Sequence, residues 1–127
     1  MINLTLPFPP TINHAYGYAG KRKYLKKEGH EFRKAVTEAA IEAKAKISGR
    51  LAIFIALYPA TRRKFDIDNR VKAVQDALQL AGVFLDDEQV DFLWVVRRPV
   101  VQGGMCKVVL VEYSKVHQML EQYEDYI

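Results

Sequence analysis

The alternation of apolar and polar side chains predicts several strands. Residues 2–6 alternate as a half-buried strand does, and residues 51–58 are almost wholly apolar, which favours a buried central strand over a helix. Residues 90–101 and 105–113 are also strand-like, and the Gln-Gly-Gly sequence between them predicts that they form a hairpin. Pro99 indicates that the first of these two strands lies at a sheet edge or is bulged there.

Apolar residues recur at helical spacing in three other stretches. The first begins at Glu28 and should end at Ser48-Gly49, and the second should cover residues 69–81 with Asp68 or Asn69 as its N-cap. Ser114 should cap the third. The predicted inward faces carry Phe32, Ala35, Val36, Ala39, Ala40 and Ala43; Val71, Val74, Ala77, Leu78 and Ala81; and Val116, Met119, Leu120, Tyr123 and Ile127.

The remaining stretches read as connections. Residues 11–20 are rich in turn formers and should be a loop, residues 60–64 form a polar loop, and residues 65–68 should be extended. The order β-loop-α-β-β-α-β-β-α predicts one mixed α/β (α+β) domain over residues 1–127, with helices packed on a mixed sheet. Residues 114–127 would be a C-terminal helical extension.

The net charge of +4 is unevenly distributed. The first 50 residues hold ten Lys and Arg against four Asp and Glu, whereas the rest hold nine against eleven. A basic region joined to an acidic one suits a protein that binds a polyanion and holds a metal against it, although lysines that only keep a domain soluble would give the same net charge. We expect a cytoplasmic protein with no membrane segment, in which the lone Cys106 is a buried, inert thiol.

Two acidic pairs flank the second predicted helix. Asp66 and Asp68 would project from one face of an extended segment, and Asp86 and Asp87 follow the helix. Hard oxygen ligands without cysteine or paired histidine favour Mg²⁺, with Mn²⁺ as a possible substitute, over zinc. Lys72 lies one helical turn after Asp68 and could neutralise a phosphate, although an aspartate and a lysine at a helix start are also common without any function.

The distance between the two pairs tests whether they can form one site. A helix over residues 69–81 carries the chain about 20 Å away at 1.5 Å per residue, and the next six residues return about the same distance only when fully extended. Residues 83–85 should therefore be a strand that runs back beside the helix. Otherwise Asp87 would serve the site of a neighbouring subunit.

The sequence FDIDNRVKAVQDALQLAGVFLDDEQV resembles the signature of the RusA-type Holliday-junction resolvases. The shared pattern is D-[LI]-D-N, a lysine three residues after the asparagine, an Asp-Ala-Leu helix, and G-x-[FWL]-x-D-D-x-Q-V. The likeness covers residues 1–113 and includes the proline-rich segment 7–13 and residues 23–33. The last predicted helix lies beyond it.

This resemblance implies a Mg²⁺-dependent homodimer that binds four-way DNA junctions and nicks two opposed strands. The catalytic, metal-binding carboxylates of the family would correspond to Asp66, Asp68 and Asp87, and its essential lysine to Lys72. Asp86 should matter less. Arg70 departs from the compared pattern, which often has an apolar residue there, and could add a phosphate contact.

Cations elsewhere in the chain are candidate DNA contacts. Three of them immediately precede the first acidic pair, and five others lie in a run interleaved with tyrosines that could stack on bases. Each cation taken alone could equally belong to a solvated loop. The candidate set is Arg62, Arg63, Lys64, Arg70, Lys21, Arg22, Lys23, Lys26, Lys27 and Asn13.

The residues alone leave two alternatives open. The same acidic site could cut flaps or forks instead of four-way junctions, or the chain could be a DNA-binding module without catalysis.

Overall fold

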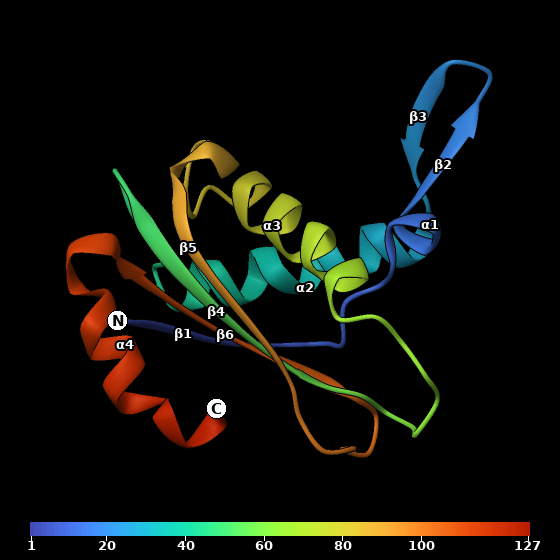
Figure 1. Cartoon of the computed structure of the whole chain (residues 1–127). Coiled ribbons are helices and arrows are strands. Elements are labelled where there is room, and N and C mark those ends of the chain that lie inside the picture. Colours follow the sequence, from blue (N-terminus) through green and yellow to red (C-terminus); the bar gives the residue numbers. More distant parts are fainter.

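The computed structural model describes all residues from 1 to 127 and is built around one central strand (Figure 1). This strand, β4 (Leu51–Tyr58), is buried along its length except at Tyr58, as its apolar sequence predicted. It pairs on one side with β6 (Met105–Glu112), antiparallel, and on the other with β5 (Val90–Arg97), parallel. β1 (Ile2–Leu6) completes the sheet in the order β1-β6-β4-β5.

The predicted hairpin between the two later strands is wrong, because β4 lies between them. Gly103 and Gly104 do form a turn with positive φ angles of 80° and 71°, but the turn carries the chain past β4 to its other side. A strand that is apolar on both faces is most stable at the centre of a sheet, where both of its edges are paired. β5 is thereby an edge strand, as Pro99 indicated.

Two helices, α2 (Lys27–Glu42) and α3 (Val71–Leu80), cover one face of the sheet. Their inward sides include Phe32 and Val36 from α2 and Val74 and Leu78 from α3, all of which are buried.

α2 ends at Glu42, six residues before the predicted Ser48-Gly49 stop. Lys44 leaves the helical conformation with a φ of 51°. The chain then turns inward so that Ala45 and Ile47 join the core, and the Ile47 amide donates to the Val83 carbonyl.

Residues 11–20 are ordered secondary structure and not the predicted loop. Thr11 caps a single helical turn, α1 (Ile12–Ala15), by accepting a hydrogen bond from the His14 amide. The next residues form β2 (Tyr16–Ala19), which pairs with β3 (Arg22–Leu25) through a turn at Gly20, whose φ is 63°. This basic hairpin (residues 16–25) projects from the rest of the molecule in Figure 1.

The C-terminal segment covers the other face of the sheet with a short helix, α4 (Val116–Gln122). Met119 and Tyr123 are buried there, against Phe54 of β4. Phe92 and Trp94 of β5 pack on the same cluster.

Two details of this helix differ from the prediction. Ser114 does not cap it, because a 3₁₀ turn at Tyr113–Lys115 precedes the helix and Lys115 is the N-cap. The apolar stripe is also narrower than predicted, because Ile127 is exposed. None of the helices is both long and apolar enough to cross a membrane.

Candidate active site

Asp66 and Asp68 lie just before α3 and are not in the extended segment that the sequence predicted. Ile67 has helical angles (φ −64°, ψ −37°), and Asp68 begins a 3₁₀ turn, Asp68–Arg70, that leads into the helix. Residues two apart in a helical turn do not face the same way, so strand alternation does not place these two carboxylates on one face. The two aspartates are still separated by only one residue in the chain, and both are exposed.

Neither carboxylate is used within the chain. Asp68 does not cap the helix, and Asn69 does not either, because the N-cap of α3 is Arg70 and makes no side-chain cap hydrogen bond. No hydrogen bond or ion pair of the chain involves the side chain of Asp66 or Asp68. Two unpaired carboxylates at one end of a helix are available to a cation.

The three predicted DNA contacts upstream of this pair lie in the loop that joins β4 to α3. Arg62, Arg63 and Lys64 are all exposed, and none of them forms an ion pair. The loop is attached at its end, where Arg97 donates a 2.9 Å hydrogen bond to the Phe65 carbonyl. Three free cations therefore lie directly beside the first acidic pair.

Arg70 is more enclosed than the loop cations. Its Nη1 donates to the Pro9 carbonyl at 2.8 Å, and its guanidinium lies over the rings of Phe8 and Phe65. Desolvation lowers the pKa of Arg70, and its buried Nε has no hydrogen-bond partner. Arg70 thus fastens the proline-rich segment to the start of α3, and its contact with DNA stays a prediction.

The return from α3 to the second acidic pair is not the predicted strand. Val83 and Phe84 are buried in the core, while Leu85 is 85% exposed. The Val83 amide donates to the Leu78 carbonyl, which closes the end of the helix, and its own carbonyl accepts from Ile47. The segment belongs to no sheet. After Asp86, the chain continues into a 3₁₀ turn, Asp87–Gln89.

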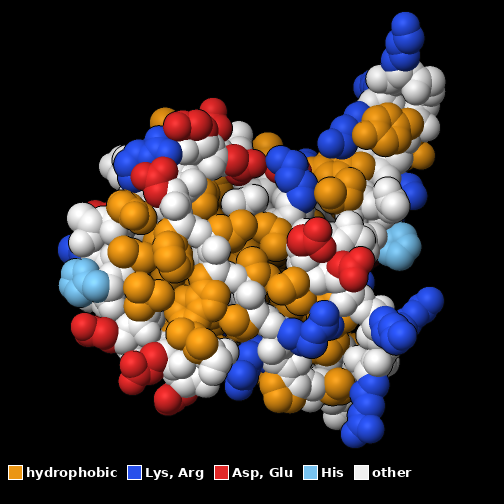
Figure 2. Space-filling view, in the orientation of Figure 1, with side chains coloured by type: hydrophobic (Ala, Val, Ile, Leu, Met, Phe, Trp, Pro, Cys, Tyr) orange, Lys and Arg blue, Asp and Glu red, His pale blue; other side chains and the backbone are white.

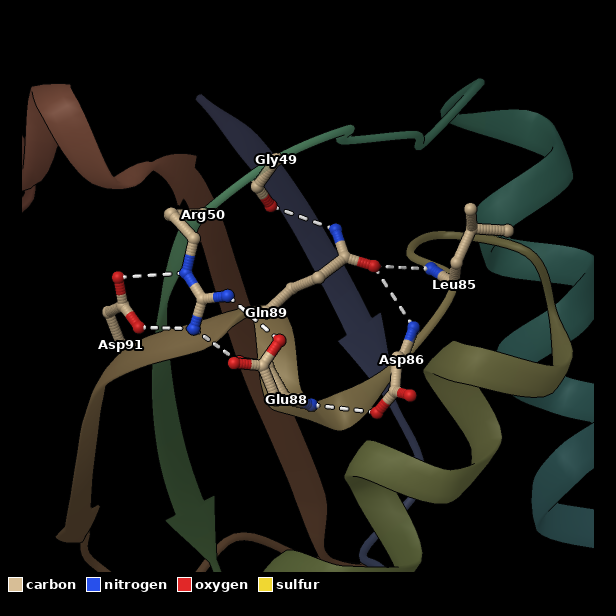
Figure 3. Close-up of polar contacts among 7 residues, drawn as sticks. All are labelled: Gly49, Arg50, Leu85, Asp86, Glu88, Gln89 and Asp91. Carbon is tan, nitrogen blue, oxygen red and sulfur yellow. Dashed lines mark hydrogen bonds and ion pairs between the residues drawn. The ribbon is translucent and has the colours of Figure 1, made fainter.

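This acidic turn is tied down by its own side chains (Figure 3). The Asp86 carboxylate accepts from the Glu88 amide at 2.9 Å. The Gln89 side chain accepts from the amides of Leu85 and Asp86 at 2.9 and 3.0 Å and donates to the Gly49 carbonyl at 2.8 Å. Asp86 thus serves as a structural cap in this structure.

Arg50 fastens the other side of the turn, as Figure 3 shows. It lies 2.9 Å from Glu88 Oε2 and 2.5 Å from Asp91 Oδ1, and it also donates to the Glu88 carbonyl. The Asp91 and Glu88 hydrogen bonds raise the pKa of Arg50, and the pKa of Asp91 is lowered by Arg50 in return. The turn that carries Asp87 is therefore held from both ends.

Lys72 and Asp87 come together across this part of the fold. Lys72 Nζ lies 3.3 Å from Asp87 Oδ2, and the Asp87 amide donates to Gln79 Oε1 on the same face of α3. The other carboxylate oxygen, Asp87 Oδ1, is buried and has no hydrogen-bond partner. A buried oxygen without a donor is costly, so this atom is suited to a ligand such as a cation.

The three predicted carboxylates do not assemble into one site within the chain. No group of three His, Cys, Asp or Glu side chains lies close enough together to hold a metal ion. Mg²⁺ prefers hard oxygen ligands, and it usually takes one or two carboxylates besides water and substrate phosphate, so the carboxylates of this region are donors of the right kind for this ion.

Three polar residues lie around Lys72 that were not predicted from the sequence as part of this site. Asp76 accepts from Lys72 at 2.9 Å and from the Tyr16 hydroxyl at 2.5 Å, and Arg33 donates to that hydroxyl at 2.7 Å. The four-residue spacing of Lys72 and Asp76 on a predicted helix was the available signal. Tyr16 and Arg33 reach the cluster from distant elements, so no local pattern indicates them.

The other predicted DNA contacts lie on and around the basic hairpin. Lys21, Arg22 and Lys23 are exposed on it, and Figure 2 shows basic side chains along its projecting end. Lys26 donates instead to the Asn13 carbonyl at 2.8 Å, which ties the foot of the hairpin to α1. Lys27, in the first turn of α2, is exposed as well.

Comparison with known proteins identifies the family. The family model described as "Endodeoxyribonuclease RusA" matches residues 7–109. The chain belongs to the RusA family. The match includes both acidic pairs, Lys72 and the basic hairpin, and it ends at residue 109, within β6.

Relatives from bacteria and phages agree with this RusA assignment. The chain is 36% identical over 112 residues to "Crossover junction endodeoxyribonuclease RusA" of Shigella sonnei strain Ss046, an alignment that covers 87% of this chain and 93% of the relative. It is 35% identical, with the same coverage, to the protein of that name from Escherichia coli K12. The phage HK97 protein of the same name is 36% identical over 114 residues, covering 87% of this chain and 94% of the relative.

Proposed function

We propose that this RusA-family protein is an endodeoxyribonuclease that resolves four-way DNA junctions by paired nicks in opposed strands. The observation that carries the proposal is the arrangement at the start of α3. Two exposed, unpaired carboxylates, Asp66 and Asp68, lie there between a loop of three free cations and Lys72. Relatives that are 36% identical over 112 and 114 residues are named crossover junction endodeoxyribonucleases.

The site would hold Mg²⁺, or Mn²⁺ in its place, through Asp66, Asp68 and Asp87. The hard carboxylate donors and the unsatisfied Asp87 Oδ1 support this assignment. When bound, the ion supplies an activated water and stabilises charge on the phosphate that is cut.

The protein's own residues would position the DNA strand. Arg62, Arg63 and Lys64 bind phosphates next to the scissile bond, and the ammonium of Lys72 neutralises charge that develops on the phosphate oxygens. The basic hairpin contacts a neighbouring part of the backbone. These contacts are independent of base sequence, which suits an enzyme that selects a branched shape.

We also propose that the active form is a homodimer in which the partner copy completes each site. The absence of a three-carboxylate group within one chain supports this arrangement, because Asp87 can then serve the partner's Asp66 and Asp68. The outer edge of β5 is unpaired and Leu93 is 45% exposed, and Figure 2 shows a hydrophobic surface over this strand. Exposed apolar edges of this kind favour association.

A comparison of DNA substrates tests the proposal. The protein would be incubated with a mobile four-way junction, a flap, a fork and a linear duplex, each with Mg²⁺ or with EDTA. Paired nicks in the junction alone, and only with metal, would support it. Cleavage of the flap or fork at a similar rate would indicate a broader nuclease, and tight junction binding without product would indicate a binding module. A resolvase of this kind acts on DNA in the cytoplasm of a bacterium or of a phage-infected cell.

A further inference from the structure

Lys72 has two carboxylate partners, of which only Asp87 belongs to the proposed metal site. Lys72 Nζ lies 2.9 Å from Asp76 Oδ1 and 3.3 Å from Asp87 Oδ2. The Asp76 side chain is also less exposed, at 17% compared with 29% for Asp87. The shorter distance and the lower exposure both strengthen the pairing with Asp76. That hydrogen bond, more than the one to Asp87, raises the pKa of Lys72 against the opposing effect of burial.

Asp76 is itself held from two other elements. The Tyr16 hydroxyl lies 2.5 Å from Asp76 Oδ2, and Arg33 Nη2 lies 2.7 Å from the same hydroxyl. Arginine can only donate, so the tyrosine oxygen accepts from Arg33 and its hydrogen points to Asp76. Both oxygens of Asp76 are thus engaged, one by Lys72 on its own helix and the other through β2 and α2.

We propose that Asp76 is the positioning residue of this site, which holds the Lys72 ammonium so that Asp87 stays available to a cation. This inference rests on the proposed function. Without Asp76, Lys72 would have Asp87 as its only carboxylate partner, and an ammonium paired with that carboxylate would compete with a metal ion for it. With Asp76 present, Lys72 keeps a partner when the cation takes Asp87.

The same cluster connects the site to the basic hairpin. Tyr16 is the first residue of β2, and the ammonium of Lys23 lies 4.0 Å from the centre of its ring. Tyr16 therefore connects Lys23, a predicted DNA contact on β3, with Asp76, the carboxylate that holds Lys72.

The test is Mn²⁺ binding to the folded protein without DNA, measured by electron paramagnetic resonance of the free ion. Asp76→Asn should weaken Mn²⁺ affinity about tenfold, as loss of a supporting carboxylate typically does. Asp76→Glu should restore part of the affinity. The matched control is Asp125→Asn, which removes the same charge from an exposed aspartate near the C-terminus and should change nothing. Circular dichroism would verify that each variant is folded.

A double-mutant cycle with Lys72→Met separates positioning from simple charge. If Asp76 acts through Lys72, Asp76→Asn should have little effect in the Lys72→Met background. An equal loss in both backgrounds would mean that Asp76 attracts the ion by its own charge, and unchanged affinity of the single variant would mean that it has no role; either result overturns the inference. If wild type and Asp68→Asn bind Mn²⁺ equally, the proposed metal site itself is wrong, and the inference falls with it.

Discussion

Some acidic side chains of this protein form hydrogen bonds or ion pairs within the chain, and others form none. Asp86 accepts a hydrogen bond from the Glu88 amide and Asp91 pairs with Arg50, whereas Asp66 and Asp68 have no side-chain partner in the chain. Carboxylates that are close together and unpaired repel each other, and this repulsion lowers the stability of the folded protein unless a bound ligand offsets it. The free pair is therefore where a cation would have most effect.

Asp68→Asn tests this at the residue scale. The substitution removes a metal ligand and a negative charge together, so cleavage of a four-way junction should be abolished while junction binding is kept or tightened. Single-turnover cleavage and fluorescence anisotropy measure the two effects. A variant that cuts at the wild-type rate would refute the assignment of Asp68.

Cys106 gives a prediction that concerns stability and not catalysis. Burial raises the pKa of its thiol from 9.0 to about 12. Between these values the unfolded state loses the proton first, so stability that is present below pH 9 should decrease as the pH rises, by at most about 1.4 kcal/mol per pH unit.

Guanidinium unfolding at several pH values compares wild type with Cys106→Ala. The stability difference between the two should shrink above pH 9, because the alanine variant lacks the titrating thiol. The native thiol should also be inert to a disulfide reagent at pH 8. Rapid labelling of the folded protein would contradict the buried placement.

At the scale of elements, α3 is the part that joins core and site. Its inner side buries Val74 and Leu78, and its other side carries Lys72 and Asp76. Leu78→Ala should therefore lower the free energy of unfolding by about 2–5 kcal/mol. Leu80→Ala on the same helix, where Leu80 is 62% exposed, should change it by less than about 0.5 kcal/mol. Similar losses in denaturant melts of both variants would contradict the observed packing.

The loop between β4 and α3 makes a second prediction at this scale. Replacing Arg62, Arg63 and Lys64 by Ala should weaken junction binding and reduce its salt slope by up to about three units, because each phosphate contact releases counterions. The matched control replaces three exposed lysines outside the proposed footprint: Lys34, Lys46 and Lys115. An unchanged slope for the loop variant would remove the loop from the DNA footprint.

The elements also show which parts of the structure the sequence could predict. The limits of β4 followed from its apolar run, and the buried face of α3 followed from its spacing, because both signals are local. The predicted hairpin is wrong because strand pairing depends on the whole sheet: β4 is the most apolar strand and lies at the centre, between β5 and β6. Within the site, Lys72 was predictable from its distance to Asp68, but Tyr16 and Arg33 reach Asp76 only through tertiary packing.

At the scale of the whole molecule, symmetry decides whether the proposed site is complete. One chain holds no group of three potential ligands, and a four-way junction has two strands to be cut. A two-fold dimer presents two sites to such a substrate. If each site takes Asp68 from one copy and Asp87 from the other, the two residues act in trans.

Mixed dimers of two inactive variants test this directly. Asp68→Asn and Asp87→Asn would each inactivate both sites of a homodimer. In a mixed dimer with sites completed in trans, one site would carry both substitutions and the other would carry neither, so unfolding and refolding the two variants together should restore nicking of one strand of the junction. If both aspartates of a site came from the same chain, every site in the mixture would keep one substitution. The mixture would then stay as inactive as its components, which would refute completion by the partner copy.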